Sequence, residues 1–151
     1  MIAWRIVHRK FVDVAFTGEG ARLFPGRWNQ SGEAAVYVAG SLALAALELF
    51  VHVQRDDDET DFVSLRVDIP DELEVETIAD LPRDWDAEPP LPSTRALGSA
   101  WLARGRTLLL RVPSALIPQE HNYLVNPLHR EFRKLKIGRA EPFRFAGRMW
   151  K

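Results

Sequence analysis

The pattern of hydrophobic positions predicts several short strands. Residues 2–7 have a β-like pattern, and apolar and polar side chains alternate most clearly in residues 61–70, where every second side chain is apolar. An alternation with a period of two is typical of a strand that buries one face of a sheet. Shorter apolar runs predict further strands in residues 34–39, 107–118 and 141–148.

Helices are predicted in three places. Residues 42–53 follow Ser41, which can act as the N-cap. The second helix begins at the capping residue Ser93, runs to Ala103 and is closed by Gly105. A third, short helix is expected within residues 126–135, where an Asn-Pro pair supplies the cap and the first residue. The helix over residues 42–53 is apolar on every side, which predicts that it is buried.

Two long segments have the composition of loops. Residues 16–33 contain several glycines and a proline, and residues 71–92 are rich in prolines and acids. Loops of this length inside a compact domain are often functional. Because the predicted strands outnumber the helices, the pattern indicates a single mixed α+β domain over residues 1–151.

Composition places the chain among globular proteins, because 46% of its 151 residues are hydrophobic and 27% are charged. The net charge of −1 gives no support to a direct nucleic-acid partner, although acidic residues gather in mid-chain and basic residues near the end. No signal peptide and no membrane-spanning apolar run can be recognised. We therefore expect a cytoplasmic protein without a membrane partner.

The residue types that are missing narrow the chemistry. The chain has no cysteine, which excludes disulfides, thiolate zinc clusters and a cysteine nucleophile. His8, His121 and His129 do not have metal-binding spacing, so no metal is expected. No glycine-rich nucleotide fingerprint is present, which argues against hydride transfer and kinase chemistry.

Glu48 is the most unusual residue of the apolar helix. At helical spacing it shares a face with Leu44, Leu47 and Val51. Burying an unpaired carboxylate costs several kcal/mol, so Glu48 needs either a neutralising partner or a place facing a cleft. An ion pair with His52, four residues further on, is one alternative. A carboxylate in a functional site is the other.

Tyr37 and Arg27 precede this helix. In the predicted strand, Tyr37 shares its face with Ala35 and Ala39, which leaves room for a flat ligand beside its ring unless another side chain fills it. Arg27 lies in the first long loop and offers a bidentate fork for phosphate, unless it is simply solvated.

The three residues together fit an enzyme that cleaves a dinucleotide at its nicotinamide–ribose bond. Breaking this bond leaves an oxocarbenium-like ribose, which a carboxylate stabilises. An arginine would hold the pyrophosphate, and an aromatic ring would orient the departing nicotinamide.

Two long motifs carry a resemblance to a known family. "GRWNQSGEAAVYVAGSLALAALELFVHV" and "LLLRVPSALIPQEHNYLVNPLHREF" resemble the RES-domain family, the toxins of RES–Xre type toxin–antitoxin pairs, and the likeness begins at "WRIV" and covers nearly the whole chain. The family's arginine, glutamate and serine fall on Arg27, Glu48 and Ser114, and a tyrosine used with them falls on Tyr37. The resemblance implies a fold like that of the diphtheria-toxin type of ADP-ribosyltransferases and NAD as the substrate.

The resemblance also implies roles and partners. ADP-ribose would be transferred to a cellular protein, with NAD glycohydrolysis or phosphorolysis as the alternative, and an Xre-type helix-turn-helix antitoxin would cover the active site. Ser114 has no evident histidine base, so it is interpreted as a residue that orients the cofactor and not as a nucleophile. Arg5 and Asn126 are further candidates for cofactor binding, with Asn122 as an alternative to Asn126; a turn or helix cap is the other explanation for the asparagines.

Two other classes of function remain open from the residues alone. The basic C-terminal part would suit a ribonuclease or RNA-binding toxin. A non-catalytic interaction module would use its apolar surfaces only for a partner. The sequence does not choose between a protein, water and phosphate as the acceptor of ADP-ribose.

Overall fold

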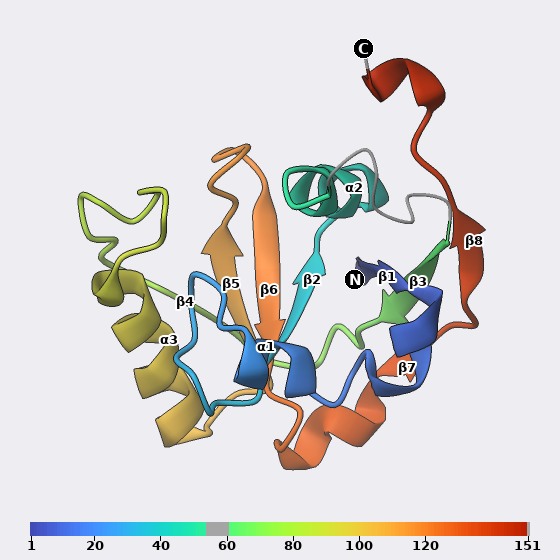
Figure 1. Cartoon of the computed structure of the whole chain (residues 1–151). Helices are drawn as coiled ribbons and strands as arrows, with labels where there is room; N and C mark the ends of the chain where they lie inside the picture. Colours follow the sequence, from blue (N-terminus) through green and yellow to red (C-terminus); the bar gives the residue numbers. More distant parts are fainter. Residues whose placement is uncertain (54–60, 151) are drawn as a thin grey trace.

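The strands of the computed structural model form one sheet (Figure 1). The structure describes residues 1–53 and 61–150, so most of the acidic run from Arg55 to Asp61 lies outside the described residues. Within these ranges the strands are β1 (Ile2–His8), β2 (Val36–Ala39), β3 (Phe62–Asp68), β4 (Val75–Thr77), β5 (Leu109–Pro113), β6 (His121–Val125), β7 (Lys136–Ile137) and β8 (Glu141–Phe143). Their order is β4-β5-β6-β2-β1-β3-β7, with β8 also paired to β3.

The helices lie against different parts of this sheet (Figure 1). They are α1 (Glu19–Leu23), α2 (Leu42–Phe50) and α3 (Pro92–Arg104), with short 3-10 turns at Arg9–Val14, Arg130–Lys134 and Gly147–Trp150. Helix α2 packs on β1 and β2. Helix α3 lies beside the β5–β6 part of the sheet, and its buried Trp101 joins residues of these two strands in one core cluster. No helix among the described residues has both the length and the hydrophobicity needed to cross a bilayer.

The sheet has a narrow seam between β1 and β2. These two antiparallel strands are paired at a single position, Trp4 with Ala39. By contrast, β1 pairs with β3 over its whole length, and β2 pairs with β6 over four positions. The sheet thus consists of two well-paired halves joined at one position. Away from this position β1 and β2 are not paired, which leaves space between them for side chains of the site.

Local signals located several elements correctly. Ser41 caps α2 as predicted, because its Oγ accepts a hydrogen bond from the Leu44 backbone N–H at 3.0 Å. Gly105 ends α3 in the left-handed conformation, with φ of 60°. Strand β3 lies within the segment with the clearest alternation.

Other expectations were wrong. The loop over residues 16–33 contains α1, and the segment over residues 71–92 contributes β4, which pairs in parallel with β5. Strand β6 had not been predicted at all. Helix α2 ends at Phe50 and is not buried on every side, because only its inner face meets the sheet and Leu47 remains 38% exposed.

Candidate active site

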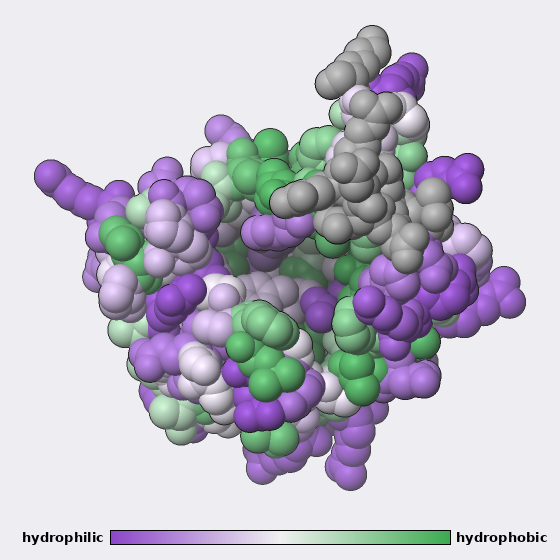
Figure 2. Space-filling view, viewed as in Figure 1, coloured by the Kyte–Doolittle hydropathy of each residue, from purple (hydrophilic) through white to green (hydrophobic). Residues whose placement is uncertain are grey.

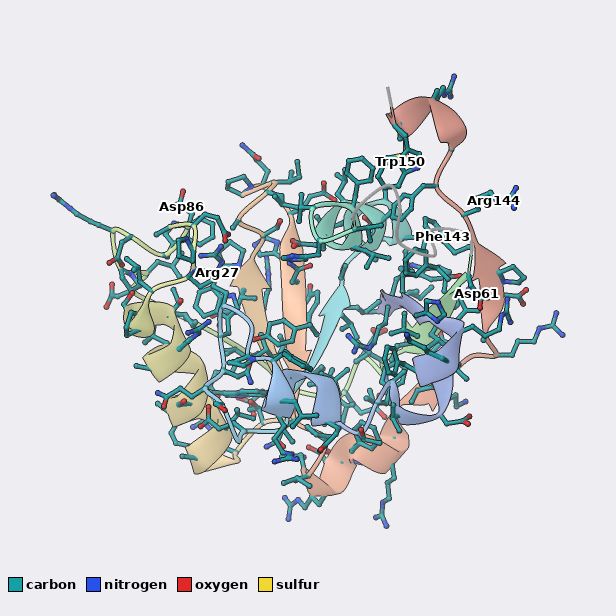
Figure 3. The ribbon with its side chains drawn as sticks, viewed as in Figure 1. Arg27, Asp61, Asp86, Phe143, Arg144 and Trp150 are labelled. Carbon is teal, nitrogen blue, oxygen red and sulfur yellow. The ribbon has the colours of Figure 1, made fainter. Side chains whose placement is uncertain are left out.

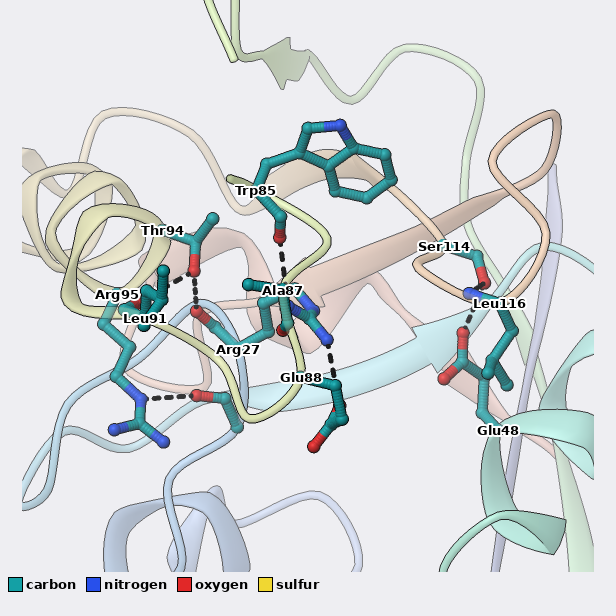
Figure 4. Close-up of polar contacts among 11 residues, drawn as sticks. Arg27, Glu48, Trp85, Ala87, Glu88, Leu91, Thr94, Arg95, Ser114 and Leu116 are labelled. Carbon is teal, nitrogen blue, oxygen red and sulfur yellow. Dashed lines mark hydrogen bonds and ion pairs between the residues drawn. The ribbon is translucent and has the colours of Figure 1, made fainter. Parts of the chain in front are cut away.

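The carboxylate of Glu48 is held by two neutral donors. Glu48 is half-buried on α2, and its Oε1 accepts a hydrogen bond from Ser114 Oγ at 2.7 Å (Figure 4). The same oxygen accepts a second hydrogen bond from Asn122 Nδ2, also at 2.7 Å. Among the described residues no cation lies within ion-pair distance, so the alternative pair with His52 is not formed. Charge-assisted hydrogen bonds offset part of the cost of removing the carboxylate from water. Both bonds end on one oxygen.

Ser114 lies behind Glu48 and is almost fully buried, with 1% of its surface exposed. It follows the last residue of β5, and its Oγ accepts hydrogen bonds from the backbone N–H groups of Leu116 and Ile117, each at 3.1 Å. Because these two donors occupy the lone pairs of Oγ, the hydroxyl hydrogen is directed to Glu48. The structure therefore places Ser114 where it orients the carboxylate.

Glu48 faces a cleft made of two adjoining cavities. The first, here called the sheet cavity, lies at the seam between β1 and β2 beneath α2 and has a volume of about 270 Å³. The second, the loop cavity, is bounded by the loop before β2 and the segment before α3 and measures about 390 Å³. The two cavities share four lining residues, Tyr37, Glu48, His52 and Asn122. Figure 2 shows a hollow in the middle of this face, with hydrophobic residues on its upper rim.

The ring of Tyr37 lines both cavities, while its hydroxyl group is hydrogen-bonded to other residues of the protein. The hydroxyl donates to Asn29 Oδ1 at 2.8 Å and accepts from the Trp28 backbone N–H at 3.0 Å. Burial raises the pKa of Tyr37 above its usual range, so the hydroxyl stays neutral. The loop passes so close that a Cβ at Gly26 would lie 2.8 Å from the Tyr37 hydroxyl oxygen. The ring, and not the hydroxyl, is available to a ligand.

Arg27 lines the loop cavity on the α3 side, near Asp86 (Figure 3). Its Nη1 donates to two backbone carbonyls, Trp85 O at 3.0 Å and Ala87 O at 2.7 Å (Figure 4). Its Nη2 meets Glu88 at 3.4 Å, and the Glu88 side chain is 79% exposed. An exposed carboxylate at that distance contributes little. An anion entering the loop cavity can therefore replace Glu88 while the carbonyls keep the guanidinium in place.

Arg5 crosses the seam from β1. Its Nη1 donates to the backbone oxygen of Tyr37 at 2.9 Å, at a point where the two strands are no longer paired. Burial lowers the pKa of Arg5 to about 10, which leaves the group cationic at neutral pH. Arg5 lines the sheet cavity together with Trp4 and Ile6.

Comparison with known proteins gives a consistent result. A model of the RES domain matches residues 2–146. The chain belongs to the RES-domain family. It is 43% identical over 135 residues to "Toxin Res" of Photorhabdus laumondii subsp. laumondii, covering 89% of this chain and 86% of that protein. It is 38% identical over 152 residues to the "Prs ADP-ribosylating toxin" of Sphingobium sp., covering 97% and 94% respectively.

A solved structure supports the fold of this RES domain. The M. tuberculosis MbcT-MbcA toxin-antitoxin complex contains a chain that superposes with a TM-score of 0.76 at 19% sequence identity, covering 95% of this chain and 84% of that one. The likeness confirms the fold class predicted above, a mixed α+β domain. The family resemblance stated from the sequence is likewise confirmed.

The predicted site residues of the RES domain are only partly brought together. Arg5, Arg27, Tyr37 and Glu48 all line the cleft. Asn126 does not line either cavity, because its Oδ1 caps the turn after β6 by accepting from the Leu128 backbone N–H at 3.1 Å. Of the two asparagines considered, Asn122 is the one that reaches the cleft.

Asn29 is a residue of the site that sequence analysis missed. Its side chain is fully buried, and its Oδ1 accepts from Tyr37 and from the Gly26 backbone N–H at 2.8 Å. Its Nδ2 donates to three backbone carbonyls of the same loop, those of Ala21, Gln30 and Glu33. An asparagine in a glycine-rich loop resembles any turn residue, so only the fold shows that it fixes Tyr37 and the residue before Arg27.

Proposed function

We propose that this chain is an NAD-consuming toxin that breaks the nicotinamide–ribose bond and transfers ADP-ribose to a protein acceptor. The observation that carries the proposal is the arrangement of Glu48 in the cleft. Its Oε1 receives both hydrogen bonds, and its Oε2 has no partner among the described residues. One oxygen is thus fixed by the protein and the other is available to a substrate.

The free oxygen suits the charge that develops during the reaction. As nicotinamide departs, positive charge appears on the ribosyl carbon, and a preorganised carboxylate stabilises it without having to reorient. Glu48 Oε2 would contact the ribose, by its charge or through a hydroxyl group. Ser114 would act through Glu48 as a positioning residue, which differs from the cofactor contact expected from the sequence.

The remaining residues would hold the two ends of NAD. The face of Tyr37 offers a stacking surface for the nicotinamide ring. Arg27 would bind the pyrophosphate in the loop cavity, where the two carbonyls already orient its guanidinium. Arg5 would contact NAD from the sheet cavity, which its side chain lines.

A protein acceptor is supported by one relative in particular. The Sphingobium protein that bears the name "Prs ADP-ribosylating toxin" is 38% identical over nearly the whole chain. Transfer of ADP-ribose to a protein acceptor in the cytoplasm is therefore the form of the reaction that we propose. Hydrolysis or phosphorolysis of NAD without a protein acceptor is the alternative outcome.

The test uses Glu48→Gln, which keeps the shape of the side chain and removes its charge. Wild-type protein incubated with cell lysate and adenylate-labelled NAD should label one protein band, and Glu48→Gln should lower the rate at least about 100-fold. Free labelled ADP-ribose without a band would assign hydrolysis. Unchanged NAD turnover by a folded Glu48→Gln protein would refute the proposed site, and RNA cleavage with intact NAD would support the ribonuclease alternative.

We also propose an Xre-type antitoxin that covers the cleft. The structural neighbour was solved as a toxin-antitoxin complex. Exposed apolar residues border the cleft, with Val51 55% and Leu116 39% exposed. Such a rim favours a protein partner. Co-expression with a cognate Xre-type antitoxin should yield a stable complex that does not consume NAD, and Val51→Glu should weaken this complex.

A further inference from the structure

Two buried polar atoms of the described residues have no hydrogen-bond partner, the Nε of Arg5 and the Oδ1 of Asn122. One is a donor and the other is an acceptor. Both residues line the sheet cavity. A buried donor or acceptor that stays unpaired costs about 1–3 kcal/mol, so native proteins rarely leave such atoms without a ligand or water.

The orientation of the Asn122 amide is fixed by its neighbour. Its Nδ2 donates to Glu48 Oε1 at 2.7 Å. A carboxylate only accepts hydrogen bonds, so the flipped amide would set two acceptors against each other. The amide oxygen of Asn122 must therefore point away from Glu48. This oxygen is the unpaired acceptor.

The rest of the sheet cavity suits a flat and largely apolar group. Its walls are supplied mainly by Trp4, Ile6, Val38, Ala45 and Leu49, and its polar residues are those already described for the cleft. A volume of about 270 Å³ is small for a whole dinucleotide and suits one ring with its substituent. The carboxylate of Glu48 in the wall disfavours a phosphate there.

From these observations we propose that Asn122 and Arg5 recognise the carboxamide of nicotinamide in the sheet cavity. The carboxamide NH2 donates to Asn122 Oδ1, and the carboxamide oxygen accepts from the Arg5 guanidinium. The inference rests on the proposed cleavage of NAD and assigns the leaving group to one half of the cleft. It also gives Asn122 two contacts, one that positions Glu48 and one that selects the leaving group.

The proposal is tested with 3-acetylpyridine adenine dinucleotide, in which a methyl group replaces the carboxamide NH2 and the carbonyl is kept. Wild-type protein should prefer NAD over the analogue in kcat/KM, and Asn122→Ala should reduce that preference about tenfold, the loss expected for one hydrogen bond to a buried acceptor. Comparing the ratio between proteins removes the intrinsic difference in leaving-group reactivity.

Two control variants separate recognition from the positioning of Glu48. Ser114→Ala removes the other donor to Glu48, so both substrates should slow together and the ratio should stay at the wild-type value. Arg5→Lys alters the group that contacts the carbonyl, which both substrates contain, so its ratio should also be unchanged. Asn122→Ser serves as a second variant, and circular dichroism with thermal unfolding verifies the fold of each protein.

The outcomes distinguish this inference from the proposed function. If NAD is consumed but Asn122→Ala and Asn122→Ser keep the wild-type ratio, the carboxamide assignment is overturned and the proposed function stands. If NAD is not consumed, the proposed function fails. In that case binding of free nicotinamide, measured by calorimetry against 3-acetylpyridine, decides the inference: equal or absent binding of the two compounds overturns it.

Discussion

Replacing Asn29 with alanine would test how the loop before β2 holds the site. The substitution removes a fully buried side chain that makes five hydrogen bonds. Three of them are short, at 2.8 Å, and their partners are the Gly26 N–H, the Tyr37 hydroxyl and the Ala21 carbonyl. The other two, at 3.2 Å, are weaker.

The expected loss follows from these three partners. Each buried group that loses its partner costs about 1–3 kcal/mol, and water entering the space left by the side chain reduces this to the lower end. Asn29→Ala should therefore lower the free energy of unfolding by about 3 kcal/mol. Urea unfolding with linear extrapolation measures the change. NAD turnover should fall as well, because Tyr37 and the backbone beside Arg27 lose their anchor.

The neighbouring Gln30 supplies the control. Its side chain is exposed, and it takes part in the hydrogen bonds of this loop through its backbone. Gln30→Ala should change stability by less than about 0.5 kcal/mol. A loss below about 1 kcal/mol for Asn29→Ala, with turnover unchanged, would refute the view that this asparagine holds the loop in place.

Two further predictions concern packing and ionisation. A Cβ at Gly98 of α3 would lie 1.5 Å from the Trp28 carbonyl oxygen, so Gly98→Ala should lower the free energy of unfolding in urea by about 3 kcal/mol. Gly20→Ala is the control and should not destabilise the protein, because a Cβ there meets nothing within 4 Å. Equal effects of the two substitutions would contradict the close approach at Gly98. Because burial raises the pKa of Tyr37, its hydroxyl should keep its proton near pH 10, where an ordinary tyrosine is half ionised. Absorbance at 295 nm in a Tyr123→Phe protein measures the ionisation of Tyr37. A titration midpoint at about pH 10 would refute this prediction.

Local patterns predicted the parts of the structure that short-range physics determines. The N-cap of α2 and the alternation of β3 depend on neighbouring residues, and both were found where the sequence indicated. The presence of Glu48 on an apolar helix was also enough to predict that it needs a partner or a cleft. These inferences required no knowledge of residues distant in the chain.

Elements stabilised by distant contacts could not be predicted in this way. Strand β4 has three residues and is defined by its parallel pairing with β5, more than thirty positions away. Helix α1 has five residues and lies between glycines, so its sequence reads as a loop. Helix α2 is less buried than expected because only one of its sides meets the sheet, and Leu47 on the other side stays 38% exposed.

The partners of Glu48 show most clearly why the site itself needed the fold. Ser114 and Asn122 are 66 and 74 residues away from it. From charge alone a cation such as His52 was a reasonable partner, yet a cation on Oε1 would oppose the positive charge that the proposed reaction develops on the ribose. Neutral donors orient the carboxylate without cancelling its field. A serine and an asparagine therefore suit the proposed chemistry better than the ion pair that burial alone would favour.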